Sequence, residues 1–243
     1  VELIDRHVGR WVEAGEIVGF DCFKMLAFDI ICTALLHLDY TDEQKRFLEQ
    51  QLRVFLDGLF SAPVDLPGFA FHRGLKARAF IMKEVERAVV QRRADIDKGV
   101  SVPDDLLKLW ITARDPDTGS AMTLEQIKTQ VLLMMFAGHD TTSTVMTNLL
   151  YYLNHHPAAA AAARAEQDHL AATLGEHYLA LDPPMPHTDA LVKETLRLTP
   201  PVTALTKRAL RAFTLDKGNG EAVHVPAGAV VLASIAATHA RGG

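Results

Sequence analysis

Apolar side chains recur every three or four positions along most of this 243-residue chain, the spacing that places them on one face of an α-helix. The pattern predicts helices over residues 20–38, 41–59, 75–97, 104–113, 123–150, 157–174 and 189–198. Toward the carboxyl end it gives way to short β-like runs between turns rich in glycine and proline, at residues 203–210, 213–215, 223–225 and 230–234. The sequence therefore predicts a mainly α fold with a small β-sheet region near the C-terminus. We expect one domain over 1–243, with a helical body over 1–200 and a β-rich unit over 201–235.

Two of the predicted helices have a clear start signal. Thr41 is followed three residues later by Gln44, and Thr123 is followed in the same way by Gln126. In such a capping box each side chain satisfies a backbone N–H group of the other residue. We therefore expect the helices to begin directly after Thr41 and Thr123.

The middle of the long helix predicted over 123–150 contains residues that destabilise a helix. Gly138 costs about 1 kcal/mol relative to alanine in a helix interior, and Asp140, Thr141 and Thr142 are poor helix formers. A threonine at such a position can bond back to the carbonyl one turn earlier, and a glycine lets another group approach the backbone. Because the residues before this point are apolar on nearly every side, we expect the middle of the helix to be buried. Residues that destabilise a strongly predicted helix are often kept because they form a functional site. The alternative is that these polar residues simply lie on a face of the helix that is exposed to solvent.

Composition limits the classes of partner. Lys and Arg (25) nearly balance Asp and Glu (30) and form no basic stripe, which argues against nucleic acid. Cys22 and Cys32 are too few for a disulfide scaffold and lie in apolar surroundings, so we expect buried, inert thiols. No continuous apolar stretch reaches membrane-spanning length.

The sequence offers little for a metal-dependent enzyme. Several of the 11 histidines lie near one another, but none has a His-Glu-x-x-His or other convincing ligand spacing: His155, His156, His169, His177 and His187. Asp104 and Asp105 are similar to the carboxylates of diphosphate-binding helices only superficially, because Leu106, Leu107 and Lys108 follow. We expect scattered histidines and no metal site.

Two ordered motifs carry a family resemblance. The segment 137–143 reads Ala-Gly-His-Asp-Thr-Thr-Ser, and the segment 193–201 reads Lys-Glu-Thr-Leu-Arg-Leu-Thr-Pro-Pro. The first resembles the oxygen-binding helix of the cytochrome P-450 superfamily of haem-thiolate monooxygenases, and the second resembles its Glu-x-x-Arg helix. The resemblance covers essentially the whole chain and implies a partial cytochrome P-450 fold. Residues 63–78 look like the branch that hydroxylates retinoids, sterols and terpenoids.

The resemblance assigns roles to the residues of the first motif and to one arginine. Ala137 and Gly138 would leave room for dioxygen and for haem b against the helix backbone. Thr141 would hydrogen-bond the bound dioxygen, and Asp140 would relay protons inward from solvent. Arg208 matches the basic residue that pairs with a haem propionate. His139 is expected to face away from the haem.

The second motif has two readings. Glu194 and Arg197 are three residues apart on one helix face, and by themselves they would be a surface ion pair. The resemblance instead implies a buried structural pair that holds the core around the haem pocket.

The chain departs from the family at the iron ligand. The family binds iron through a cysteine in a Phe-x-x-Gly-x-x-x-Cys-x-Gly loop, and neither Cys22 nor Cys32 has that context, so no metal ligand is assigned. Residues 240–243 also differ from the expected His-Arg-Asp-Pro turn. We predict that the polypeptide by itself has no monooxygenase activity.

By resemblance, the complete enzyme would insert one oxygen atom of dioxygen into an apolar, terpenoid-like molecule. It would take electrons from a redox partner, either a reductase or a ferredoxin. Apolar residues over 60–71, on the long helix before Ala137 and over 202–205 would face a hydrophobic substrate. Its location would be cytoplasmic in a bacterium, whereas a eukaryotic form could carry a membrane anchor. The alternative is a non-catalytic helical binding or interaction protein derived from such an enzyme.

Overall fold

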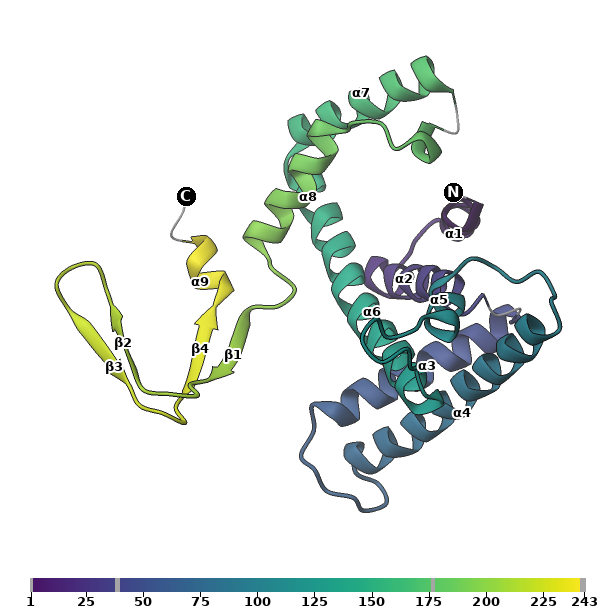
Figure 1. Ribbon diagram of the computed structural model, residues 1–243. Helices are drawn as coiled ribbons and strands as arrows, with labels where there is room; N and C mark the ends of the chain where they lie inside the picture. Colours follow the sequence, from purple (N-terminus) through teal and green to yellow (C-terminus); the bar gives the residue numbers. More distant parts are fainter. Residues whose placement is uncertain (1, 38–39, 176–177, 241–243) are drawn as a thin grey trace. The chain divides into compact units, whose positions relative to one another are not determined.

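The structure is a computed structural model that describes residues 2–37, 40–175 and 178–240 (Figure 1). Its contacts divide the chain into two compact units, Val1–Ser143 and Thr144–Gly243, and the division falls inside helix α6 (Leu124–His155). The expected single domain over 1–243 stays a prediction. No helix among the described residues is long and apolar enough to cross a membrane.

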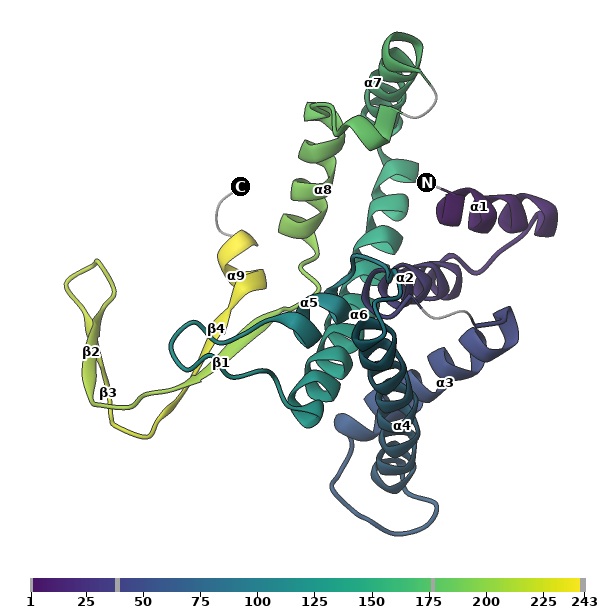
Figure 2. The same ribbon diagram turned by 45° about the vertical axis from the view of Figure 1, so that its right-hand side comes forward.

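The first unit is a helical bundle. Besides the amino-terminal part of α6, it contains α1 (Glu2–Ala14), α2 (Gly19–Leu35), α3 (Asp42–Leu59), α4 (Ala70–Asp97) and α5 (Leu106–Thr112). Helices α3 and α4 lie side by side in Figures 1 and 2. Gly58 and Gly74 allow their backbones to touch, because a Cβ atom on Gly58 would lie 2.7 Å from the Cα atom of Gly74. The apolar core of this unit is built mainly from α2, α3, α4 and α6, and its most buried members include Phe28, Leu52, Ile81, Val131 and Met135.

A buried ion pair joins α4 to α5 within this core. Nη1 of Arg92 lies 2.8 Å from both carboxylate oxygens of Asp105, and the two side chains are only 8% and 6% exposed. Arg92 also donates to the carbonyl of Leu36 at 3.1 Å. Asp105 accepts from the backbone N–H of Lys108 at 2.9 Å and so caps α5. The neighbouring Asp104 is 95% exposed, so these two adjacent carboxylates do not form a shared diphosphate or metal site.

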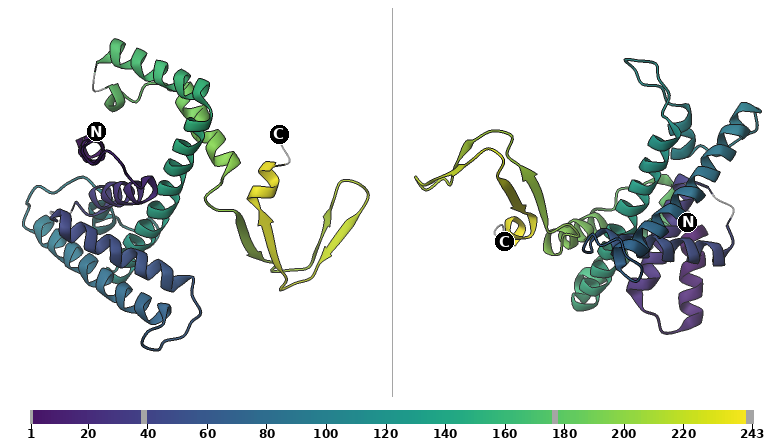
Figure 3. Two further views of the ribbon diagram at one scale, coloured as in Figure 1. Left: turned by 180° about the vertical axis from the view of Figure 1, so that it is seen from behind. Right: turned by 90° about the horizontal axis from the view of Figure 1, so that it is seen from below.

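The second unit begins with the carboxyl-terminal part of α6. It continues through α7 (Pro157–Leu174), the 3₁₀ helix η1 (Tyr178–Leu181), α8 (Pro186–Leu198) and α9 (Ile235–Ala240). Strand β1 (Ala204–Arg208) pairs with β4 (Val230–Ser234), and β2 (Phe213–Asp216) pairs with β3 (Ala222–Val225), both antiparallel. Figure 3 shows these two ribbons joined end to end.

A carboxylate on α7 holds the start of α8. Glu166 accepts the backbone N–H groups of His187 at 2.8 Å and Thr188 at 2.9 Å, and the Thr188 hydroxyl at 2.7 Å. These donors belong to the first turn of α8, where backbone N–H groups have no partner inside the helix. The contact therefore fixes α8, which carries the second sequence motif, against α7.

Several sequence predictions are confirmed. Helix α7 and strand β4 have the predicted bounds, and both capping boxes form: Thr41 with Gln44, and Thr123 with Gln126. Three helices are longer than predicted, because α4 begins at Ala70, α6 continues to His155 and α8 begins at Pro186.

Among the described residues, α1, the 3₁₀ helix η1 and α9 were not predicted. The helix predicted over 20–38 ends earlier, at Leu35, because Leu36 and His37 are not helical. Leu38, His177 and the deviating residues 241–243 lie outside the described residues.

Candidate functional site

The first sequence motif lies on α6 and is divided between two faces of that helix. Positions four residues apart on one face are fully buried: Val131, Met135, His139 and Ser143. On the opposite face Leu133 is 51% exposed, Met134 is 41% exposed and Ala137 is also exposed. The prediction that the middle of this helix is buried is therefore confirmed for one face and wrong for the other. One face packs on the core of the first unit, whereas the described residues leave the other apolar face open.

Thr141 follows Ala137 by one helical turn at the edge of this open face. Its hydroxyl donates to the carbonyl of Ala137 at 2.6 Å, which confirms the predicted bond to the preceding turn. Since the hydroxyl hydrogen is directed into the helix, the oxygen presents its lone pairs to any approaching ligand. Thr141 can therefore accept a hydrogen bond from a group on the open face.

Gly138 permits a close helix contact. A Cβ atom at this position would lie 2.9 Å from Cδ1 and 3.2 Å from Cγ1 of Ile31 on α2. The predicted close approach to the backbone at Gly138 therefore occurs, and the approaching group is the side chain of Ile31. The role of Gly138 beside dioxygen stays a prediction.

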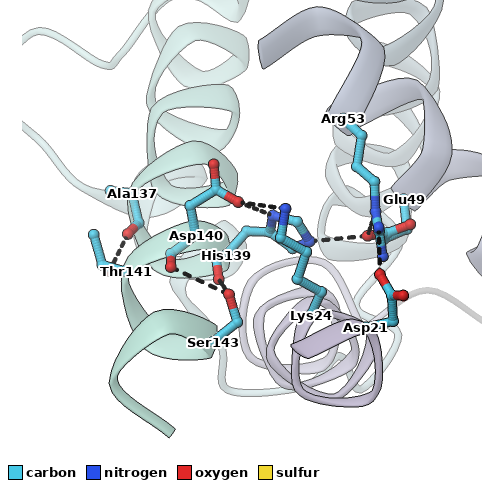
Figure 4. A network of polar contacts seen from close by, with 9 residues as sticks. All are labelled: Asp21, Lys24, Glu49, Arg53, Ala137, His139, Asp140, Thr141 and Ser143. Atoms are coloured by element: carbon cyan, nitrogen blue, oxygen red, sulfur yellow. Dashed lines mark hydrogen bonds and ion pairs between the residues drawn. The ribbon is translucent and has the colours of Figure 1, made fainter. Parts of the chain in front are cut away.

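His139 lies between two carboxylates in the interior of the first unit (Figure 4). Its side chain is 0% exposed, with Nδ1 3.1 Å from Oδ1 of Asp140 and Nε2 3.0 Å from Oε1 of Glu49 on α3. The ring of Phe28 contacts it edge-on, with centroids 6.3 Å apart. The histidine therefore links the middle of α6 to α3. This link could not be predicted from the sequence, because its two ends are 90 positions apart.

The link continues to solvent on both sides. Nζ of Lys24 on α2 lies 3.3 Å from Oδ1 of Asp140. On the other side, Arg53 hydrogen-bonds Glu49 through Nε, and its Nη1 lies 2.9 Å from Oδ1 of Asp21. Together these side chains form what we call the His139 cluster: Asp21, Lys24, Glu49, Arg53, His139 and Asp140 (Figure 4).

Burial, hydrogen bonds and neighbouring charges shift the pKa values of Asp140, His139 and Glu49 in the cluster. The hydrogen bond from His139 lowers the pKa of Asp140, against a smaller opposing effect of burial, and the charge of Lys24 lowers it further. Burial favours the neutral form of His139, but the hydrogen bonds to Asp140 and Glu49 together outweigh it, and the pKa of His139 is raised. Burial likewise opposes ionisation of Glu49, yet hydrogen bonds from His139 and Arg53 lower its pKa overall. All three shifts favour the charged forms.

The remaining predicted residues lie in the second unit. Arg197 binds Glu194 through two hydrogen bonds of 2.7 Å each, but the side chains are 38% and 53% exposed. The expectation of a buried pair is therefore corrected. Among the described residues, α9 contacts the pair through the carbonyl of His239, which lies 3.2 Å from Nη1 of Arg197. Both side chains are partly exposed to solvent. Arg208 ends strand β1 and is exposed.

The two cysteines are poor thiolate ligands. Cys32 is buried, and burial, aided by the charge of Asp29, strongly raises the pKa of its thiol. Cys22 is partly buried, where a buried thiol was expected, and desolvation together with Asp21 raises its pKa as well. Among the described residues no group of three or more His, Cys, Asp or Glu side chains could hold a metal ion.

Comparison with known proteins gives the family. A family model described as Cytochrome P450 matches residues 10–241. The chain belongs to the cytochrome P450 family. It is 26% identical over 238 residues to a putative cytochrome P450 120 of Synechocystis sp., covering 98% of this chain and 51% of that protein. It is 29% identical over 244 residues to a beta-amyrin 28-monooxygenase of Solanum lycopersicum, covering 98% of this chain and 50% of that protein.

Solved P450 structures share the fold. The retinoic acid bound cyanobacterial CYP120A1 matches with a TM-score of 0.82 and 26% identity, covering 98% of this chain and 51% of that one. The haem domain of cytochrome P450DA matches with a TM-score of 0.82 and 24% identity, covering 98% and 52%. The chain spans about half the length of the curated relatives it matches.

P450 membership implies haem as the cofactor, and the residues of this chain fit one side of it. The open apolar face of α6, with the small side chain of Ala137 beside the Thr141 hydroxyl, suits a flat apolar ring and a small polar ligand. The exposed guanidinium of Arg208 suits a propionate. Neither Cys22 nor Cys32 fits the axial thiolate, because their environments favour the protonated thiol.

Proposed function

We propose that the protein is a haem-dependent monooxygenase that hydroxylates an apolar small molecule of terpenoid type. One oxygen atom of dioxygen enters a C–H bond of the substrate and the other leaves as water, with two electrons supplied through a redox partner and two protons taken up from solvent. The observation that carries the proposal is the arrangement on α6, where an open apolar face ends at Thr141 beside the anchored carboxylate of Asp140.

The residues of this chain would provide the surroundings for that reaction. Haem, when bound, supplies the activation of dioxygen. Leu133, Met134 and Ala137, exposed in the structure, would form an apolar wall that excludes water once haem and substrate cover them. Thr141 accepts a hydrogen bond on that face, and Asp140, whose side chain is 38% exposed, exchanges protons with solvent. Arg208 would hold a propionate.

The terpenoid class is supported by the names of relatives. They include beta-amyrin 28-monooxygenases and a cholesterol 22-monohydroxylase of Trigonella foenum-graecum, and the similar CYP120A1 structure holds retinoic acid. All three compounds are large, apolar and derived from isoprene units. We extend this class to the present protein, together with a reductase or ferredoxin as the electron donor.

The proposal is tested with protein expressed from its complete reading frame and loaded with haem. With NADPH, a reductase and a panel of triterpenoids, sterols and retinoids, we expect one hydroxylated product. Asp140→Asn should lower turnover about a hundredfold, the lower end of what a positioned acid or base contributes. Thr141→Val should lower the product formed per NADPH oxidised. Thr142→Val, at the exposed neighbouring position, is the matched control and should retain both values.

The proposal fails if protein that binds haem oxidises no member of the panel. It also fails if Asp140→Asn and Thr142→Val have the same turnover. Residues 1–243 expressed by themselves are expected to be inactive, because neither cysteine suits the iron. Saturable binding of a terpenoid by that polypeptide without haem would favour the alternative, a non-catalytic binding protein.

A further inference from the structure

We propose that His139 is a positioning residue that clamps Asp140. As a buried cation it bridges Glu49 of α3 to Asp140 of α6, and so fixes which carboxylate oxygen of Asp140 is free to exchange protons. The inference rests on the proposed function for the role of Asp140, but the clamp itself can be tested without turnover.

The geometry of the two ring nitrogens requires a charged ring. Nδ1 lies 3.1 Å from a carboxylate oxygen of Asp140, and Nε2 lies 3.0 Å from one of Glu49. An ionised carboxylate only accepts hydrogen bonds, and a neutral imidazole has one N–H donor. A neutral ring would therefore direct a lone pair at one of the two carboxylates, in a site where the ring is 0% exposed. With both carboxylates ionised, only the imidazolium form satisfies both contacts.

The charges that face the ring lead to the same conclusion. The cluster holds three carboxylates and two side chains that stay cationic at neutral pH: Asp21, Glu49, Asp140, Lys24 and Arg53. These five groups sum to one negative charge, and a protonated His139 brings the cluster to neutrality. Loss of that proton would remove one of the two cationic partners of Glu49, a carboxylate that is only 7% exposed, and burial of a poorly compensated charge is costly. The edge of the Phe28 ring, on α2, closes the site from the remaining side.

The clamp acts on one oxygen atom of Asp140. Both His139 Nδ1 and Lys24 Nζ contact Oδ1, at 3.1 and 3.3 Å, and Figure 4 shows the other oxygen directed away from them. The anchored Oδ1 fixes the orientation of the carboxylate, while Oδ2 remains for solvent or a proton donor. Because both donors are cations, they hold Asp140 in its ionised form near neutral pH. Asp140 would then begin each cycle as a proton acceptor.

The first test is a titration of the histidine rings by NMR, in protein expressed from its complete reading frame. We expect the His139 ring to keep its proton above the ordinary pKa of 6.5. Glu49→Gln keeps the shape of the side chain but removes its charge, and should move the titration of His139 to lower pH. A His139 ring that is neutral at pH 6.5 in the unmodified protein would overturn the proposal, and this result needs neither turnover nor a stable His139 variant.

The second test separates positioning from mere packing. His139→Gln should shift the acidic limb of the pH–turnover profile, which reports Asp140, to higher pH. His7→Gln is the matched control, because His7 is also buried in the first unit, 2.7 Å from Asp29, but has no contact with the His139 cluster in the described structure. It should leave the limb in place. A limb that is unmoved in folded His139→Gln would overturn the proposal. Protein that binds haem, shows the expected titration and oxidises no substrate would instead overturn only the proposed function.

Discussion

The adjacent carboxylates Asp104 and Asp105 offer a sharp test of the structure. Asp105→Asn removes the negative charge that faces Arg92 in the core, with little change of shape. Asparagine caps a helix about as well as aspartate, so the start of α5 is retained. The change therefore isolates the loss of one charge from a buried pair whose side chains are 8% and 6% exposed.

The structure sets the size of the effect. Removing one partner of a buried ion pair costs about 3–5 kcal/mol, because the other charge stays buried without compensation. In this case the new amide oxygen can still accept from Arg92, which also keeps its hydrogen bond to the carbonyl of Leu36. Both contacts reduce the loss, so we expect the free energy of unfolding of the first unit to fall by about 3 kcal/mol, the low end of that range.

Urea unfolding followed by tryptophan fluorescence measures this change. Both tryptophans, Trp11 and Trp110, lie in the first unit. With a slope of about 1–3 kcal/mol per molar urea, a loss of about 3 kcal/mol moves the midpoint by about 1–3 M. Asp104→Asn is the matched control: its side chain is 95% exposed, and the midpoint should stay within experimental error. Equal effects of the two variants would refute the assignment of Asp105 to the core.

Two further predictions concern packing and pH. Gly58→Ala should destabilise the first unit by about 1–2 kcal/mol, because a Cβ atom would lie 2.7 Å from the backbone of Gly74 and outweigh the better helix propensity. In Gly9→Ala, in α1, the added Cβ atom would have no neighbour within 4 Å, so the free energy of unfolding should rise by up to about 1 kcal/mol. Urea unfolding measures the decrease for Gly58→Ala and the increase for Gly9→Ala. The stabilising contribution of His139, whose pKa is raised, is fully present below pH 6.5 and is lost as the pH rises through its folded-state pKa. That of Glu49, whose pKa is lowered, is present above pH 4.5 and is lost as the pH falls through its folded-state pKa. Measured from pH 4 to 9, the free energies of unfolding of the parent protein and of His139→Gln should therefore differ most between pH 4.5 and 6.5. A difference that grows above pH 6.5 would contradict a charged His139 ring.

Local features of the site could be predicted from the sequence, because they depend on neighbours along the chain. The capping boxes at Thr41 and Thr123 and the bond from Thr141 to Ala137 each join residues three or four positions apart. A helix brings such residues together whatever the rest of the chain does. The family motifs could be identified for the same reason.

The sequence by itself determined the mainly helical pattern, the short paired strands and the position of the candidate site on α6. Only the tertiary structure decided which of two adjacent carboxylates is buried, which face of α6 stays open, and that His139 meets Glu49 90 positions away. Helix periodicity places a residue on a face but does not say what covers that face. Burial and charge pairing depend on elements distant in sequence, and those two quantities set the protonation of the site.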